Sequence, residues 1–227
     1  MLISSYIFGC KCNHQSFGEN FAQNNFIAEI EILKTIDIKS NNEDNRFYKA
    51  DIRILKLYKG KSVSSILIKG KVGEIFGPAC EIEVKKGDKF LVYLSTKDGL
   101  VMSSCTPKTF LNNKKIDIER NVLDFVINKK IKNTDVFYLS GNYFQKFKNL
   151  KPKNRFAVYE IRVNDKSKAK LISVIQNFGT SEDEEVLKII KREFEFSTGV
   201  FQEIKNKDIC LILFFDSNHE DLISGFI

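Results

Sequence analysis

Apolar and polar side chains alternate with a period of two along much of the first half of the chain. The longest such runs are 26–33 and 48–58, and shorter ones follow at 63–68, 81–84, 89–94 and 100–104. Alternation of this kind is typical of strands that bury one face. No helix long enough to connect parallel strands intervenes. We therefore expect an antiparallel barrel or sandwich of roughly a hundred residues.

A helical period replaces this alternation farther along the chain. Ile118, Val122, Phe125 and Val126 are spaced as on one face of a helix. We expect a short helix here that packs against the barrel. Its polar face would carry Glu119, Asn121 and Lys129.

The last third of the chain predicts strands on both sides of one helix. Runs 156–163 and 170–176 alternate, and a polar turn joins them as in a hairpin. Ser181 and Glu184 have the spacing of a capping box, which predicts that a helix starts here. The nearly continuous apolar run 207–215 is typical of a strand inside a sheet. The order strand, strand, helix, strand indicates a small α+β domain.

Together these patterns predict a mainly β protein with two domains. The barrel and its helix would occupy residues 10–130 and the small α+β domain residues 156–227, with a linker at 131–155. A length of 227 residues suits two domains. The stretch 144–155 is rich in lysine. It is either a solvated connection or a site for an anionic glycan or membrane surface.

The composition argues against several classes of function. Hydrophobic residues make up 43% of the chain and charged residues 29%, as in an ordinary globular protein. The net charge of +7 arises from lysines spread among glutamates, so we expect no specific nucleic-acid binding. The sequence lacks a phosphate-binding glycine loop, a zinc-protease helix motif and a nucleophile elbow. We therefore expect neither catalysis nor a cofactor.

The first nine residues are apolar or small and end at Cys10. They are shorter than the roughly 20 residues needed to cross a bilayer, and no other stretch approaches that length. We interpret residues 1–9 as the remnant of a signal peptide, which implies a secreted or periplasmic protein. Two alternatives stay open. Ile7-Phe8-Gly9-Cys10 resembles a loose bacterial lipobox, which would anchor Cys10 to lipid, and a plain N-terminal strand would suit a cytosolic protein.

The cysteines are the strongest chemical signal in the sequence. Cys10 and Cys12 are separated by one residue and cannot easily bridge each other, so each needs a distant partner. Cys80 and Cys105 are available for two long crosslinks. The alternative is a thiolate metal site, with His14 as a further ligand. Cys210 lies within an apolar run and is expected to be a buried, inert thiol.

The motifs between these cysteines carry a family resemblance. The Cys-x-Cys start is followed by the strand 26–33, the Tyr58-Lys59-Gly60 turn, Ala79-Cys80, the run 86–94 and Ser104-Cys105. Over residues 10–110 this order resembles the netrin-like domain of the tissue inhibitors of metalloproteinases. The resemblance implies a five-stranded OB-fold barrel in which Cys10 pairs with Cys80 and Cys12 with Cys105.

The same resemblance implies a role for the first two residues of the motif. In that family the mature chain begins at the first cysteine, whose α-amine and carbonyl chelate the catalytic zinc of a target protease. The next side chain enters the specificity pocket of the protease. By resemblance, Cys10 would be the chelator and Lys11 the pocket residue.

A second resemblance covers residues 156–216. It rests on the hairpin turn 164–167, the helix start Asp183-Glu184-Glu185 and the segment 196–199 before the last strand. These features resemble the C-terminal domain of TonB-type bacterial envelope proteins.

These observations predict a binding protein rather than an enzyme. Its sharpest expected function is inhibition of a zinc metalloendopeptidase through the N-terminal cysteine. The alternative is a non-inhibitory cell-envelope adaptor that binds protein or glycan partners through its second domain. In either case the disulfides would also stabilise a modest barrel.

Overall fold

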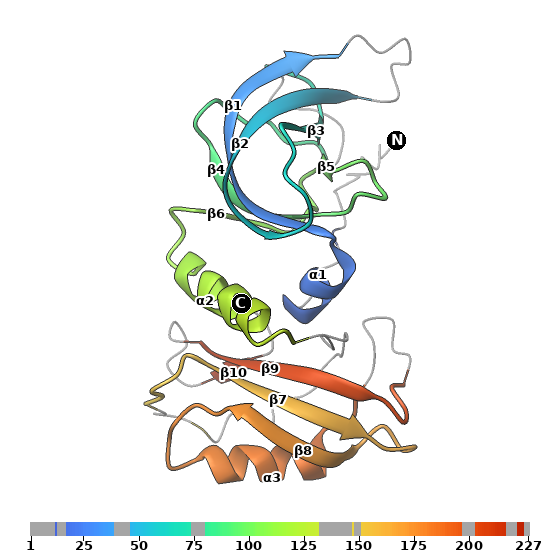
Figure 1. Cartoon of the computed structure of the whole chain (residues 1–227), viewed down its shortest axis with the longest axis vertical. Coiled ribbons are helices and arrows are strands. Elements are labelled where there is room, and N and C mark those ends of the chain that lie inside the picture. Colours follow the sequence, from blue (N-terminus) through green and yellow to red (C-terminus); the bar gives the residue numbers. More distant parts are fainter. Residues whose placement is uncertain are drawn as a thin grey trace, which may run out of the picture. The chain divides into compact units, whose positions relative to one another are not determined.

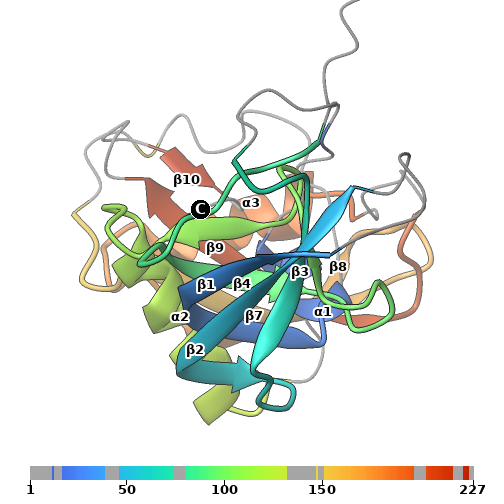
Figure 2. The same ribbon diagram turned by 90° about the horizontal axis from the view of Figure 1, so that it is seen from above.

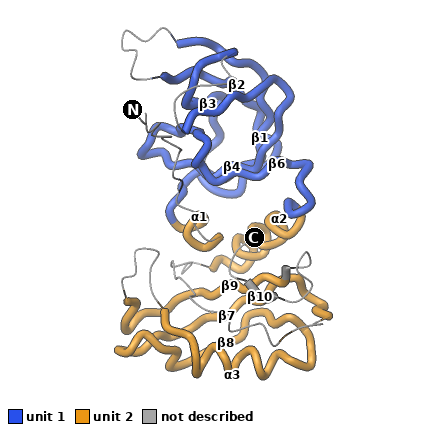
Figure 3. The backbone as a smooth tube through the Cα atoms, turned by 180° about the vertical axis from the view of Figure 1, so that it is seen from behind, with its two compact units in different colours: residues 1–14, 23–116 blue, residues 15–22, 117–227 orange. Residues whose placement is uncertain are grey.

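The computed structural model describes residues 12, 17–38, 46–73, 80–131, 147, 151–196, 203–216 and 222–224 (Figure 1). The chain divides into two compact units (Figure 3). The first unit comprises residues 1–14 and 23–116, and the second comprises 15–22 and 117–227. Both are built largely from β-strands, as the sequence predicts. Within the described residues no helix combines the length and apolarity needed to cross a bilayer.

The first unit is a six-stranded, strongly curled sheet with the strand order β5-β3-β2-β1-β4-β6. The strands are β1 (Phe26–Asp37), β2 (Phe47–Lys59), β3 (Ser65–Lys69), β4 (Lys89–Leu94), β5 (Val101–Met102) and β6 (Lys108–Phe110). All neighbours are antiparallel except β3 and β5, which run parallel. The short segment 101–110 thus supplies both outer strands of the sheet. Seen from above, β1, β2 and β3 fan out, as strong twist requires (Figure 2).

The concave side of this sheet holds the core of the first unit. Alternate residues point inward, because successive side chains of a strand face opposite sides. The buried members of this core are Phe26, Ala28, Ile30, Ile32, Tyr48, Ala50, Ile52, Ile66, Ile68, Val84, Phe90, Val92, Leu94 and Met102. Three register shifts between β1 and β2 interrupt the ladder. Such bulges bend a sheet and increase its twist, which accounts for the curl.

One predicted strand of the first unit is absent. Residues 81–84 form no strand, although Val84 is buried in the core. One backbone hydrogen bond joins this segment to the end of β3, from the Ile82 N–H to the Lys69 carbonyl (2.9 Å). The side chain of Tyr48 adds two more: its hydroxyl donates to the Ile82 carbonyl (3.1 Å) and accepts the Val84 N–H (3.0 Å). The last predicted strand, 100–104, is reduced to β5, and β6 was not predicted.

The second unit is an antiparallel sheet with helices on both faces (Figure 1). Its strands, in the order β10-β9-β7-β8, are β7 (Phe156–Val163), β8 (Ala169–Gln176), β9 (Asp208–Asp216) and β10 (Leu222–Ser224). Helix α3 (Asp183–Glu193) covers one face, and α1 (Phe17–Gln23) and α2 (Ile116–Asn128) lie on the other. The predicted strand, strand, helix, strand order is therefore present, with β10 added at one edge.

Each face of the β7–β9 pair has its own apolar contacts. Odd-numbered residues such as Tyr159, Ile161 and Leu211 share a buried cluster with Val186, Ile189 and Ile190 of α3. Even-numbered residues face the other helices. Phe125 of α2 packs edge-on against Phe156 (5.4 Å between ring centroids), and Phe17 of α1 against Phe214 (5.9 Å).

Three details of the second unit differ from the sequence predictions. Helix α2 belongs to this unit rather than to the barrel, and Glu119 on its expected polar face is buried. Phe147, within the expected linker 131–155, lies in the core of this unit. The capping box is wrong: the N-cap of α3 is Glu182, and no side chain caps it.

Candidate functional site

The cysteine cluster of the first unit is the first candidate site. Cys12 and Cys105 form a disulfide with an S–S distance of 2.04 Å and a Cα–Cα distance of 5.0 Å, which confirms the predicted pair. Cys80 is also disulfide-bonded, and its predicted partner Cys10 lies outside the described residues. The Sγ atoms of Cys105 and Cys80 are 3.9 Å apart. Two crosslinks therefore lie side by side at the turn that follows β5.

Lys108 fixes the turn that carries Cys105. Its ammonium donates to three backbone carbonyls, those of Ser103 (2.8 Å), Ser104 (2.9 Å) and Thr106 (3.2 Å). Burial lowers the pKa of Lys108, because desolvation disfavours the charged form. A cation whose three N–H groups are all directed at one turn leaves that turn little freedom. The position of Cys105 is thus set by Lys108 as well as by the disulfide.

The two residues expected to contact a target, Cys10 and Lys11, lie outside the described residues, as does His14. The alternative metal site loses one ligand, because the Cys12 sulfur is in a disulfide and is not a thiolate. In the part of the chain that the structure describes, no three His, Cys, Asp or Glu side chains are grouped to hold a metal ion.

Cys210 behaves as the sequence predicts. Its thiol is free and buried on β9, with an exposed fraction of 2%. Burial raises its pKa to about 12, and the negative charge of Glu160 acts in the same direction. A thiol with so high a pKa is almost entirely protonated at neutral pH and is a poor nucleophile.

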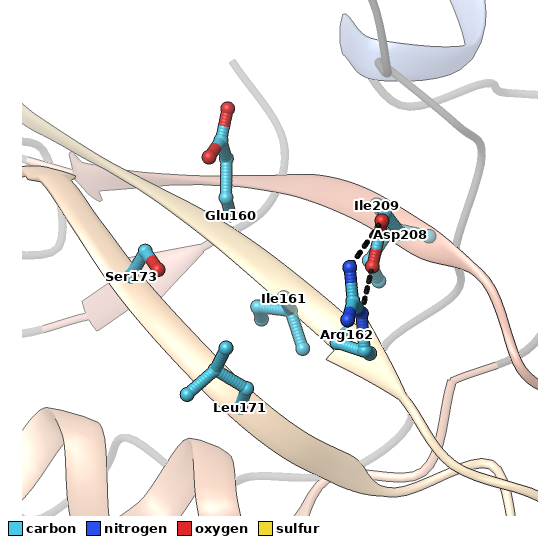
Figure 4. A pocket seen from close by; sticks show the side chains of 7 residues that line it. All are labelled: Glu160, Ile161, Arg162, Leu171, Ser173, Asp208 and Ile209. Atoms are coloured by element: carbon cyan, nitrogen blue, oxygen red, sulfur yellow. Dashed lines mark hydrogen bonds and ion pairs between the residues drawn. The ribbon is translucent and has the colours of Figure 1, made fainter.

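A shallow depression on the second unit is the other candidate site (Figure 4). Its volume is about 160 Å³. The lining residues are Glu160, Ile161, Arg162, Leu171, Ser173, Asp208 and Ile209. Glu160 and Arg162 alternate with Ile161, whose side chain faces α3, so they lie on the opposite face of the sheet. Glu160, Arg162 and Asp208 are exposed, whereas Phe156 and Val158 on the same face are buried.

An ion pair organises this depression. Arg162 on β7 and Asp208 on β9 are directly opposite in the ladder and form two hydrogen bonds, of 2.8 Å and 3.0 Å. The hydrogen bonds from Arg162 hold the pKa of Asp208 below its usual value. Glu160 lies two residues before Arg162, between Ser173 on one neighbouring strand and Cys210 on the other.

The size of the depression limits what it can bind. Pockets for small molecules usually enclose several hundred cubic ångströms and bury most of the ligand. A volume of about 160 Å³ suits one or two side chains of a bound partner. The depression is therefore a candidate contact surface for a partner.

Comparison with known proteins adds no further assignment. No protein-family model and no curated protein matches this chain.

Two features of these sites escaped the sequence analysis. Arg162 and Asp208 are far apart in the sequence, and their pairing follows only from the register of β7 and β9. Lys108 begins β6, three residues after Cys105 and directly after the turn that contains Ser103 and Thr106. That spacing is a weak signal, because a lysine next to a turn is usually solvated.

Proposed function

We propose that this protein is a non-enzymatic binding protein of an oxidising compartment, with a netrin-like first domain that contacts a zinc metalloendopeptidase through its N-terminal Cys-x-Cys segment. The observation that carries this proposal is the Cys12–Cys105 disulfide, which fastens the segment to the turn after β5. A second disulfide at Cys80 lies beside it. Disulfides of this kind favour secretion or the periplasm over the cytosol.

The topology of the first unit supports the OB-fold part of the proposal. Strands β1, β2 and β3 form an antiparallel meander, and β4 pairs with β1. The segment 101–110 pairs parallel with β3 and antiparallel with β4. If β5 and β6 are counted as one interrupted strand, this order of pairing agrees with that of a five-stranded OB-fold, which supports the proposal.

The proposed mechanism of inhibition follows from the resemblance to the tissue inhibitors of metalloproteinases. The zinc of a protease keeps one coordination position for water, which a neutral α-amine at Cys10 can take. A crosslinked segment loses less conformational entropy on binding than a free one, so its affinity is higher. Lys11 would place an ammonium in the specificity pocket. Since an unpaired buried charge is costly, the target protease should carry an acidic group there.

The test compares chains that begin at Cys10 with chains carrying one additional residue before it. The first form should inhibit a zinc metalloendopeptidase, and the extra residue should raise the inhibition constant by orders of magnitude because the α-amine is displaced. Lys11→Ala serves as the matched control, since it changes target preference but retains the chelating amine. Equal inhibition by the two forms, or none by either across representative zinc endopeptidases, would refute the proposal. A Cys10 that carries lipid would have no free α-amine and could not chelate the zinc.

A second candidate function rests on the depression of the second unit. Arg162, Asp208 and the exposed Leu171 form a mixed polar and apolar surface that extends onto the edge strand β8. An envelope adaptor would use such a surface for a protein or anionic glycan partner.

This adaptor function is tested with the full chain on envelope proteins and on peptidoglycan. Arg162→Glu should abolish binding, because it reverses a charge within the surface. Arg53→Glu is the matched control: Arg53 is an equally exposed arginine in an ion pair, with Glu31, on the first unit. Binding that is unchanged by Arg162→Glu, or is lost equally in both variants, would exclude this surface.

A further inference from the structure

The two disulfides of the first unit are close enough to react with each other. The Sγ atoms of Cys105 and Cys80 are 3.9 Å apart, although each belongs to a different disulfide. The backbones are also joined, since the Ser104 N–H donates to the Cys80 carbonyl (3.1 Å). Cys80 and Cys105 are therefore neighbours before any bond between them forms.

We propose that this pair of disulfides is a redox switch in which one reduction releases both anchors of the N-terminal segment. A dithiol reductant first cleaves Cys12–Cys105. The resulting Cys105 thiolate then attacks Sγ of Cys80, forms a Cys80–Cys105 disulfide and expels the cysteine previously bonded to Cys80. The sequence resemblance predicts that this leaving group is Cys10. The proposal does not depend on whether the protein inhibits a protease.

The electrons and atoms balance across the two steps. The dithiol supplies two electrons and two protons and becomes a cyclic disulfide, while Cys12 and Cys105 become thiols. The second step is an exchange without net oxidation: the Cys105 thiol loses its proton, and the expelled thiolate gains one. The protein ends with one disulfide fewer and two thiols more. One of these thiols is Cys12, and by the resemblance the other would be Cys10.

The surroundings of Cys105 favour the exchange. The Lys108 ammonium holds the carbonyls of Ser103, Ser104 and Thr106, which keeps the turn in place when the Cys12 bond is lost. A nearby positive charge also stabilises a thiolate. A nucleophile fixed within the chain has an effective concentration of roughly millimolar or more, which allows it to compete with external thiols.

The Cys80–Cys105 disulfide would constrain a different part of the chain from the Cys12–Cys105 disulfide. The Cys12–Cys105 bond joins residues 93 apart in sequence and ties the N-terminal segment to the sheet. The new bond would join residues only 25 apart, both within the region 80–105. The turn after β5 would stay crosslinked while the N-terminal segment became free. Reduction would thus release the N-terminal segment from the sheet without unfolding the sheet.

The test is limited reduction of the purified full chain with dithiothreitol, followed by acid quenching, alkylation and peptide mapping. Trypsin places the four cysteines on separate peptides, 1–11, 12–34, 72–85 and 98–108. The first reduced species should carry alkyl groups on peptides 1–11 and 12–34, with peptides 72–85 and 98–108 crosslinked. An early species alkylated on peptides 12–34 and 98–108, or one that retains Cys12–Cys105, would overturn the proposal.

Two variants identify the attacking sulfur. Cys105→Ser also frees Cys12 but lacks the nucleophile, so Cys80 should keep its original partner. Release of that partner in Cys105→Ser at the wild-type rate would overturn the proposal. Cys210→Ser removes the buried thiol of the second unit and should leave the wild-type exchange pattern unchanged. Loss of the exchange in Cys210→Ser would likewise contradict attack by Cys105.

Discussion

At the residue scale, Tyr48 shows how one side chain can help to hold a segment that forms no strand. It is fully buried, and its hydroxyl bonds both Ile82 and Val84. Tyr48→Phe leaves the ring in place but removes both hydrogen bonds, and the freed N–H and carbonyl stay unsatisfied. We expect the free energy of unfolding to fall by about 1 to 3 kcal/mol. Urea denaturation monitored by fluorescence measures this, and an unchanged midpoint would show that the hydroxyl contributes nothing.

The same hydroxyl makes stability depend on pH in the alkaline range. Burial raises the pKa of Tyr48 above its usual value of 10.0, so the folded state holds the phenol proton more tightly than the unfolded chain. Its contribution to stability is complete below about pH 10 and is lost as the pH rises through the folded pKa. Between about pH 9 and about pH 11, wild type should lose more stability than Tyr48→Phe. Parallel pH dependences of the two proteins would contradict this.

The burial of Cys210 leads to a prediction about the reactivity of its thiol. Because its thiol is buried and its pKa is raised to about 12, a thiol reagent at neutral pH should not modify it in the folded protein. Denaturation without a reductant should expose it. Mass spectrometry of the tryptic peptide that contains Cys210 reads out the modification before and after denaturation. Rapid labelling of the native protein would show that β9 opens locally.

The residue scale also shows what could be read from the sequence. Burial of Cys210 was predicted, because an apolar run on both sides of a thiol requires it. The role of Lys108 could not be predicted, since its three acceptors are carbonyls whose directions depend on how the turn folds. The same holds for Arg162 and Asp208, which are neighbours only in the folded sheet.

At the element scale, long periodic segments were predictable and short ones were not. Strands β4 and β7 have the predicted bounds. Strands β5 and β6 contain two and three residues, too few to express a period of two, so β5 was predicted too long and β6 was missed. Helix α1 has seven residues and was missed because so short a helix shows too few repeats of the helical period. The start of α3 was misread because the helix begins one residue later than a capping box at Ser181 requires, with Glu182 as its N-cap. The backbone N–H groups before the helix, those of Phe178 and Thr180, donate to the Asp183 carboxylate.

Helix α3 carries a testable apolar face. Val186, Ile189 and Ile190 are fully buried against the odd-numbered face of the second sheet. Ile190→Ala removes buried methyl and methylene groups and leaves a cavity, so the free energy of unfolding should fall by about 2 to 5 kcal/mol. Lys188→Ala on the exposed side of the same helix is the control, and its effect should be small. Chemical denaturation of both variants gives the comparison, and equal effects would place Ile190 outside the core.

At the scale of the whole molecule, each unit has a buried apolar cluster of its own among the described residues. Tyr48 belongs to the buried cluster of the first unit and Ile190 to that of the second. Neither of these two clusters contains a residue of the other unit. Substitutions that share no contacts usually have additive effects on stability. The sequence predicted two domains because its period changes along the chain. It could not assign α1 and α2, since an amphipathic helix does not specify which sheet it covers.

Additivity therefore tests the division into units. The double variant Tyr48→Phe, Ile190→Ala should lose a free energy of unfolding within about 0.5 kcal/mol of the sum for the two single variants. Hydrogen exchange of amides in β1 and β7 should in addition show that Tyr48→Phe mainly lowers protection in the first unit and Ile190→Ala in the second, because each core stabilises its own sheet. A coupling energy well above that margin, with equal loss of protection in both sheets, would mean that the chain unfolds as one cooperative body. In that case the cysteine crosslinks of the first unit would stabilise the second unit as well.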